Sequence, residues 1–329
     1  MLQERAPTPK RLNVRMSMPL AAARLAFGGA QRVSPDIAAF WAERLFFTPP
    51  RRRASARAQR ALATGRRWSV PFGAGQLAAW AWGEGPTALL VHGWGSRGAH
   101  MAAFVGPLLA AGFRVVAYDA PAHGLSPGRQ TDLPELASAL QAVAGAAGPV
   151  RILIAHSIGG MATALALQRG LAVDRAVLIG VPEAPDFFLA HMAGRLGLEA
   201  GTVDKLRRRV ERRVALRWSA LDLRQIVKGL IAPVLIVHDA ADADVPREHA
   251  ETLEKAWPGA QLLLTSGLGH RQILKDRDVI SRVVAFATGA PEAKCERCDK
   301  RVGDWDRASA LCDPCALDQM LFARARRDP

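Results

Sequence analysis

One stretch decides the fold of this chain, and it reads Ile154-Ala155-His156-Ser157-Ile158-Gly159-Gly160. It closes an apolar run that starts at Val150 and opens a segment with helical patterning. A serine between a strand and a helix sits on a sharp, strained turn, so the residues two before and two after it must be small. Ala155 and Gly159 meet that requirement. The stretch therefore predicts a strand, a tight turn with Ser157 at its tip, and a helix.

The middle of the chain alternates short apolar runs with helical patterns, which is the order of an α/β fold. Such an order predicts a mostly parallel central sheet with helices on both faces. The predicted strands span 76–83, 88–93, 114–119, 150–157, 175–180, 233–239 and 261–267. The predicted helices include 133–147, which starts after Asp132, as well as 158–169 and 276–287.

The turn around Ser157 resembles the nucleophile elbow of the α/β-hydrolase family, esterase and lipase-like serine hydrolases. The family's Gly-x-Ser-x-Gly pattern is matched apart from Ala155, which adds one methyl group at the first position. Two further residues follow in the family's order of serine, acid and histidine. The acid implied by the resemblance is Asp242, within Asp-x-x-Val-Pro after the strand 233–239, while Asp239 and Asp244 are competing acids that would shape the loop.

The histidine implied by the resemblance is His270, in a Gly-rich loop after the strand 261–267. A neutral imidazole would take the proton of the Ser157 hydroxyl, and Asp242 would hold its tautomer and stabilise the imidazolium. The backbone N–H groups of Trp94 and Ile158 would hold the oxyanion, because Leu89-Leu90-Val91-His92-Gly93-Trp94-Gly95 resembles the family's His-Gly-x loop.

The reaction implied is hydrolysis of a carboxylic ester of a small molecule through an acyl-enzyme, with no cofactor for catalysis. Thioester and C–C bond hydrolysis use the same groups and stay open. A serine in place of an aspartate at the elbow disfavours dehalogenase or epoxide hydrolase chemistry. Three other histidines are expected to be structural: His92, His123 and His238.

The chain divides into an N-terminal arm (1–65), a hydrolase domain (66–290) and a C-terminal module (291–329). A long insertion at about 182–232 has helical patterning at 206–218 and 221–230 and is expected to form a cap. Its arginines are expected to form the solvated face of a helix: Arg207, Arg208, Arg209, Arg212 and Arg213. The cap aromatics Phe187, Phe188 and Trp218 are candidates for lining the substrate pocket, but packing inside the cap is the simpler expectation.

The net charge of +14 is concentrated in the arm. Residues 1–67 hold 14 Lys and Arg against Glu4, Asp36 and Glu43. We expect a solvated, partly helical arm; an acidic partner or an anionic membrane surface is the alternative. Nucleic acid is not an expected ligand of the chain, because outside the arm the charges nearly balance.

The four cysteines have the spacing of a structural zinc site of the ribbon type. They are Cys295, Cys298, Cys312 and Cys315. Two disulfides, an iron–sulfur site or a redox pair are the alternatives. Such modules often contact a protein partner. Because the preceding 294 residues contain no cysteine, a reducing compartment, the cytoplasm, is expected.

No export signal is predicted, since the apolar stretch at 16–30 is broken by Arg24. No transmembrane segment is predicted either, because the longest apolar run, 152–167, contains His156, Ser157 and a glycine pair. The alternative to an enzyme is a catalytically silent scaffold, with the hydrolase fold retained and the basic arm and zinc ribbon binding a protein or nucleic acid. The complete set of Ser157, Asp242 and His270 argues against it.

Overall fold

The computed structural model describes residues 18–51 and 55–289 and builds them around one sheet. Its strands are β1 (Arg66–Phe72), β2 (Gly75–Trp82), β3 (Thr87–Val91), β4 (Arg114–Tyr118), β5 (Val150–His156), β6 (Val173–Ile179), β7 (Val234–Asp239) and β8 (Gln261–Thr265). Their order across the sheet is β1-β2-β4-β3-β5-β6-β7-β8. β2 pairs antiparallel with β1 and β4, and the other pairs are parallel. The predicted mostly parallel sheet is confirmed.

Helices connect the strands. The α-helices are α1 (Met18–Val33), α2 (Pro35–Phe46), α3 (Ala56–Ala63), α4 (Val105–Ala110), α5 (Leu133–Ala147), α6 (Ile158–Gln168), α7 (Asp186–Leu196), α8 (Ala200–Val214), α9 (Leu223–Ile226), α10 (Glu248–Ala256), α11 (Gly269–Gln272) and α12 (Arg277–Thr288). Short 3₁₀ helices are η1 (Gly98–Phe104), η2 (Trp218–Leu221), η3 (Val227–Gly229) and η4 (Ile273–Lys275).

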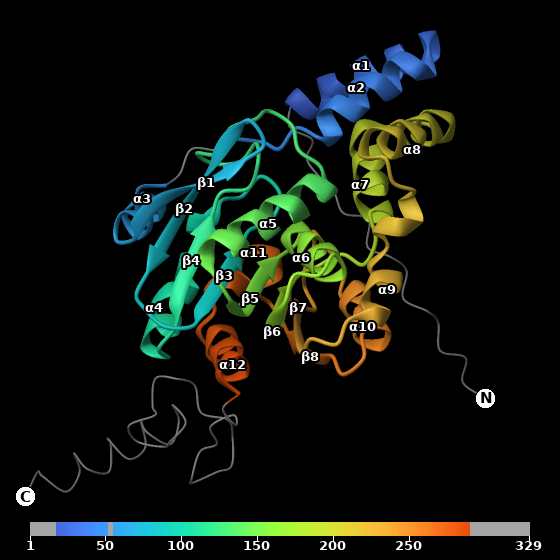
Figure 1. Cartoon of the computed structure of the whole chain (residues 1–329). Helices are drawn as coiled ribbons and strands as arrows, with labels where there is room; N and C mark the ends of the chain where they lie inside the picture. The colour runs from blue at the N-terminus through green and yellow to red at the C-terminus, as the bar shows by residue number, and fades with distance from the viewer. Residues whose placement is uncertain (1–17, 52–54, 290–329) are drawn as a thin grey trace, which may run out of the picture.

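Two apolar clusters lie on opposite faces of the sheet, because successive side chains of a strand point to opposite sides. In β3, Leu89 and Val91 belong to one cluster and Ala88 and Leu90 to the other. The first cluster includes residues of α5, α6 and α10, and the second includes residues of η1, α4 and α12. Both faces of the sheet are therefore covered, as Figure 1 shows, which is why residues 88–91 of β3 and 234–237 of β7 are continuous buried apolar runs.

The helix starts that the sequence predicts are present. Asp132 caps α5, where its side chain accepts a hydrogen bond of 2.9 Å from the Glu135 N–H. Asp276 caps α12 in the same way through the Val279 N–H, at 3.0 Å.

Three elements, β1, α4 and α10, are not among the predicted ones. In β1, Pro71 and the neighbouring arginines hide the apolar alternation of an edge strand.

The insertion between β6 and β7 forms a helical cap with bounds that differ from the predicted ones. α8 begins at Ala200, earlier than the predicted residue 206, and ends at Val214. It ends there because Ala215 takes up a left-handed conformation, with φ of 53°. The second segment with predicted helical patterning, 221–230, is divided among η2, α9 and η3.

The first two helices, which we call the N-terminal hairpin (residues 18–47), pack on this cap. Figure 1 shows α1 and α2 beside α7 and α8, to one side of the sheet. Ala38, Ala39 and Ala42 of α2 are fully buried, and Phe47 is 2% exposed. They form a third apolar cluster with cap residues such as Leu206. The expectation of a solvated arm is therefore wrong for these residues: alanines let α2 approach α8 closely.

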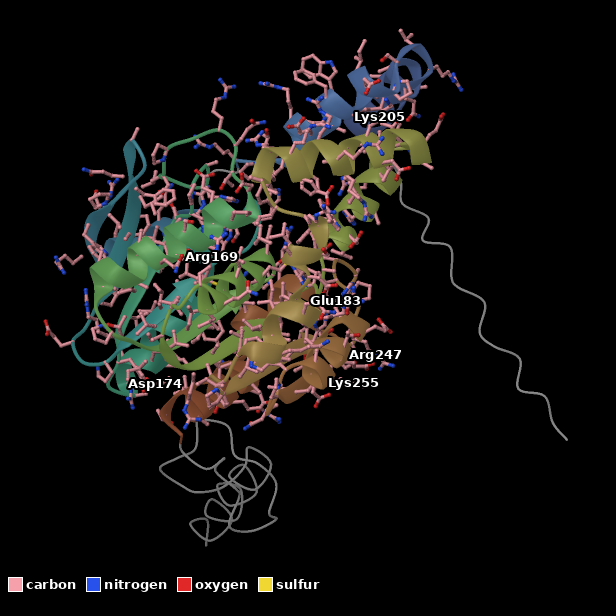
Figure 2. The ribbon with its side chains drawn as sticks, turned by 45° about the vertical axis from the view of Figure 1, so that its right-hand side comes forward. Arg169, Asp174, Glu183, Lys205, Arg247 and Lys255 are labelled. Atoms are coloured by element: carbon pink, nitrogen blue, oxygen red, sulfur yellow. The ribbon has the colours of Figure 1, made fainter. Side chains whose placement is uncertain are left out.

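The basic face of α8 is only partly solvated, which corrects the second expectation about the cap. Lys205 Nζ lies 2.7 Å from Asp36 Oδ2, and Arg209 Nε lies 2.6 Å from Glu43 Oε2. Figure 2 shows Lys205 where α8 runs beside the N-terminal hairpin. Arg208 and Arg212 are exposed. Lys205 and Arg209 therefore fix the hairpin to the cap. Two more arginines have partners as well: Arg207 binds Asp186, and Arg213 covers the ring of Phe47.

No helix in the described ranges is both long and apolar enough to cross a membrane.

Candidate active site

The turn at Ser157 connects β5 to α6 in a conformation that few residues adopt. Ser157 has φ of 54° and ψ of −130°, which is strained for a residue with a Cβ atom. Its N–H donates to the Ile179 carbonyl at 2.9 Å, which ties the turn to the neighbouring strand. A Cβ on Gly159 would lie 2.6 Å from the His92 carbonyl oxygen, and one on Gly160 would overlap the Val181 side chain. The glycines are therefore required by close packing.

Asp242 follows β7 and contacts His270. One carboxylate oxygen, Oδ2, lies 2.7 Å from His270 Nδ1. The other, Oδ1, accepts hydrogen bonds of 2.8 Å from the N–H groups of Asp244 and Val245. Burial works to raise the pKa of Asp242, but the His270 bond and the two backbone N–H groups outweigh it and leave the pKa below its usual value. The carboxyl is therefore an anion at neutral pH.

The competing acids do not contact His270. The Asp239 carboxylate accepts from Ala241 N–H in its own loop at 2.9 Å, and from Thr265 Oγ1 at 2.7 Å and Leu268 N–H at 3.0 Å at the end of β8 and in the loop after it. Asp244 is exposed. Among the three acids of this loop, the structure brings only Asp242 to the histidine.

His270 is held in place by two residues that the sequence analysis did not single out. His156 Nε2 lies 2.8 Å from the His270 carbonyl oxygen, and the two rings are 4.5 Å apart between centroids. Burial, followed by the charge of His270, lowers the pKa of His156 to about 3. His156 is thus neutral and donates through Nε2. Gly180, with φ of 59°, leaves room for the ring, since a Cβ there would lie 3.1 Å from His270 Nδ1.

The loop after β3 passes close to the serine. A Cβ on Gly93 would lie 3.0 Å from Ser157 Cβ. The loop is fixed by two neutral histidines: His123 Nε2 accepts from the Gly95 N–H at 3.0 Å, and His92 Nε2 accepts from the Ala120 N–H at 3.0 Å. Burial lowers the pKa of His92 to about 4 and that of His123 to about 3. Both are structural acceptors, as predicted.

His238 also has a structural contact. Its Nε2 lies 2.8 Å from the Val245 carbonyl, which can only accept, so Nε2 carries the proton. The contact holds the same segment whose N–H binds Asp242. His238 is therefore a support for the Asp242 loop.

The two amides expected to hold an oxyanion belong to residues next to Ser157 and next to Gly93, the glycine that lies close to Ser157. Ile158 is the first residue of α6, so its N–H has no carbonyl one turn earlier to bind. The Trp94 N–H donates no hydrogen bond to any residue in the described ranges. Trp94 and Ile158 also line one cavity.

This cavity has a volume of about 190 Å³ and an almost entirely apolar lining. Besides Trp94 and Ile158, three parts of the chain build it. The N-terminal hairpin supplies Leu45, Phe46 and Phe47; the cap supplies Phe188, Met192, Val210, Val214, Trp218 and Leu221; the start of α5 supplies Leu133 and Pro134. Phe188 and Trp218, for which packing within the cap was the simpler expectation, form part of the cavity wall.

Comparison with known proteins places this architecture in a family. A model of the alpha/beta hydrolase family matches residues 88–282, more than half of the chain. The chain belongs to the alpha/beta hydrolase family. The resemblance and the prediction of an alpha/beta hydrolase enzyme are thereby confirmed at the level of the family.

One relative of this alpha/beta hydrolase is the pimeloyl-(acyl-carrier protein) methyl ester esterase of Vibrio atlanticus (strain LGP32). It is 28% identical over 254 residues, which cover 62% of this chain and 95% of the relative. Among solved structures, an esterase from Rhodococcus sp. ECU1013 has a TM-score of 0.54 at 21% identity, covering 69% of this chain and all of that chain. A bromoperoxidase from Bacillus anthracis has a TM-score of 0.54 at 17% identity, and the match covers 68% of this chain and all of the bromoperoxidase chain. At these identities the structural likeness shows the fold alone.

The alpha/beta hydrolase match leaves the N-terminal hairpin outside it. The four cysteines predicted to bind zinc lie outside the described residues, so their arrangement stays a prediction. Within residues 18–51 and 55–289, no group of three or more His, Cys, Asp or Glu side chains is arranged to hold a metal ion.

Proposed function

We propose that this chain is a serine hydrolase that cleaves carboxylic esters through an acyl-enzyme on Ser157. The observation that carries the proposal is the hydrogen bond between His270 and the ionised Asp242. The residue before Ser157, His156, binds the His270 carbonyl, which supports a place for His270 near the serine. Asp242 accepts the Nδ1 proton of His270, which leaves Nε2 with a lone pair. A base in that tautomer is what an unactivated serine hydroxyl requires.

In the proposed reaction, His270 Nε2 takes the proton of the Ser157 hydroxyl while the oxygen attacks the ester carbonyl. The N–H groups of Trp94 and Ile158 bind the negative oxygen of the tetrahedral intermediate. The alcohol leaves with the proton from His270. Water then attacks the acyl-enzyme, gives its proton to His270 and releases the acid, which restores the Ser157 hydroxyl.

The cavity lined by Trp94 and Ile158 would bind the acyl group of the substrate, and its lining favours an apolar acyl group. Its lining offers methyl, methylene and aromatic groups, and almost nothing to bind a charged chain. Burial of apolar surface contributes roughly 0.8 kcal/mol for each methylene. Longer acyl chains should therefore raise kcat/KM until the cavity is full. Thioesters and C–C bonds would be cleaved by the same groups, and esters are the class proposed.

The substrate proposal predicts a chain-length effect for a variant that fills the cavity. In Val214→Phe, kcat/KM for p-nitrophenyl octanoate should fall at least about tenfold, since two or more methylenes lose their place. The acetate ester should be affected much less. Kinetics across acyl lengths from acetate to decanoate measure this.

Arg212→Phe serves as the matched control, because Arg212 lies on the same helix and is exposed. It should keep the wild-type profile. A Val214→Phe enzyme that loses acetate and octanoate hydrolysis equally would place the acyl chain outside this cavity.

We also propose that Cys295, Cys298, Cys312 and Cys315 bind one zinc ion as a structural module. Four thiolates close a tetrahedral site and need a reducing compartment to remain reduced, so a cytoplasmic location is part of this proposal. Elemental analysis of the purified full-length chain tests it, and a chain free of metal with paired disulfides would contradict it.

A further inference from the structure

The N-terminal hairpin carries an unusual share of the exposed apolar surface. Nine large hydrophobic side chains are exposed in the described residues, and six of them lie on α1 and α2. The six are between 40% and 82% exposed: Leu25, Val33, Ile37, Phe40, Trp41 and Leu45. Scattered single hydrophobics are ordinary on a protein surface, whereas a concentration on one element indicates an interaction surface.

On α2 these side chains form one stripe. Ile37, Phe40 and Trp41 follow the spacing that places residues on the same side of a helix. The opposite side is the one that buries Ala38 and Ala42 against the cap. α2 therefore carries apolar side chains on both sides. On the stripe, α8 contacts Phe40, whose ring lies 5.2 Å from the Arg209 guanidinium carbon, while Ile37 and Trp41 are 49% and 54% exposed.

The charges around the stripe are positive. Arg24, Arg32 and Arg44 alternate with the exposed hydrophobics along the hairpin. Its two acids, Asp36 and Glu43, are paired with Lys205 and Arg209 of the cap. The sequence of residues 1–17 adds four Lys and Arg against one Glu. The surface thus combines exposed apolar side chains with an excess of cations.

We propose that the N-terminal hairpin docks on an anionic lipid surface. Trp41, Ile37 and their apolar neighbours would enter the boundary between headgroups and acyl chains, and the arginines would bind lipid phosphates. A helix with Trp, Phe and Leu on one face and arginine beside them has the chemistry of interfacial binding. A second copy of this chain fits less well, because a symmetric contact would bring the same arginines together. A nucleic acid would leave the apolar stripe without a partner.

The stripe also reaches the cavity. Leu45 is 48% exposed and is at the same time part of the cavity wall. Docking by this surface would place Leu45, and with it one wall of the cavity, next to the lipid. Binding to lipid itself does not depend on turnover, so the test below is independent of the proposed esterase activity.

The test is flotation of the full-length chain with vesicles of phosphatidylcholine alone and of phosphatidylcholine mixed equally with phosphatidylglycerol. The wild type should bind the mixed vesicles, and added salt should weaken the binding. Ile37→Ser combined with Trp41→Ser should reduce the partition coefficient by roughly tenfold or more, because two inserted apolar side chains are lost. Arg32→Gln combined with Arg44→Gln should reduce binding to the mixed vesicles and abolish the preference for them.

The matched control is Leu125→Ser combined with Ile231→Ser, which removes two exposed hydrophobics outside the hairpin. It should bind as the wild type does, and all variants should keep the wild-type circular dichroism. Equal binding to neutral and mixed vesicles, or equal binding by the hairpin and control variants, would overturn the proposal. A folded wild type that does not bind vesicles but forms a dimer would also overturn it, if Ile37→Ser combined with Trp41→Ser dissociates that dimer. The surface would then be a contact between two copies of this chain.

Discussion

Replacing Ser157 by alanine is expected to lower kcat/KM for p-nitrophenyl esters by roughly 10⁵-fold. Alanine removes the only oxygen at the elbow that His270 is proposed to activate, and water cannot take its place in the same geometry. The strained backbone stays the same, because alanine also carries a Cβ. The measurement is initial-rate kinetics on purified protein with the melting temperature as the check on folding.

Ser138→Ala is the control for this substitution, since Ser138 lies on α5 and bonds within that helix to the Pro134 carbonyl. It should keep wild-type kinetics. A Ser157→Ala protein with most of its activity would show that hydrolysis takes place elsewhere or by another nucleophile.

Asp242→Asn is expected to lower kcat by roughly 10⁴-fold with little change in the fold. Asp242 Oδ1 accepts from two backbone N–H groups, those of Asp244 and Val245. An asparagine must keep its carbonyl oxygen toward these donors, so its NH₂ group faces His270. The imidazole would then accept at Nδ1 and carry its proton on Nε2, which is the tautomer that cannot take the serine proton.

Asp244→Asn provides the comparison that fixes the acid. Asp244 is exposed, and its carboxylate makes none of the contacts that hold His270. Its variant should stay within about twofold of the wild type. Kinetics of both variants on the same ester measure the difference. If Asp244→Asn proved the more damaging of the two, Asp242 would not be the acid of the proposed reaction.

The elbow and the sheet could be predicted because their signals are local. A buried parallel strand contains a continuous apolar run, as at 152–155 of β5 and 234–237 of β7, and the turn at Ser157 requires small residues at fixed positions. The caps at Asp132 and Asp276 are local in the same sense. The order of Ser157, Asp242 and His270 came from the resemblance to a family, and the structure adds the hydrogen bond that selects Asp242.

Contacts between distant segments could not be predicted in the same way. Ala38 and Ala42 are weak hydrophobic signals in an arginine-rich segment, yet they let α2 lie close against α8. His156 looked like a variable position of the elbow, and only the fold brings it to the His270 carbonyl. Gly180 is the last residue of a predicted strand, and nothing in the sequence pattern indicates that it has a positive φ or lies close to His270. The cavity joins three segments that only the tertiary structure brings together.

The central claim is that Ser157 is a nucleophile activated by His270, and covalent labelling tests it most directly. Full-length protein is treated with a fluorophosphonate, and its intact mass and digested peptides are measured by mass spectrometry. The account predicts one adduct per chain, on the peptide that contains Ser157, and its absence in Ser157→Ala. A folded protein that stays unlabelled, or carries the adduct on another residue, would contradict the account and favour a hydrolase fold retained as a scaffold.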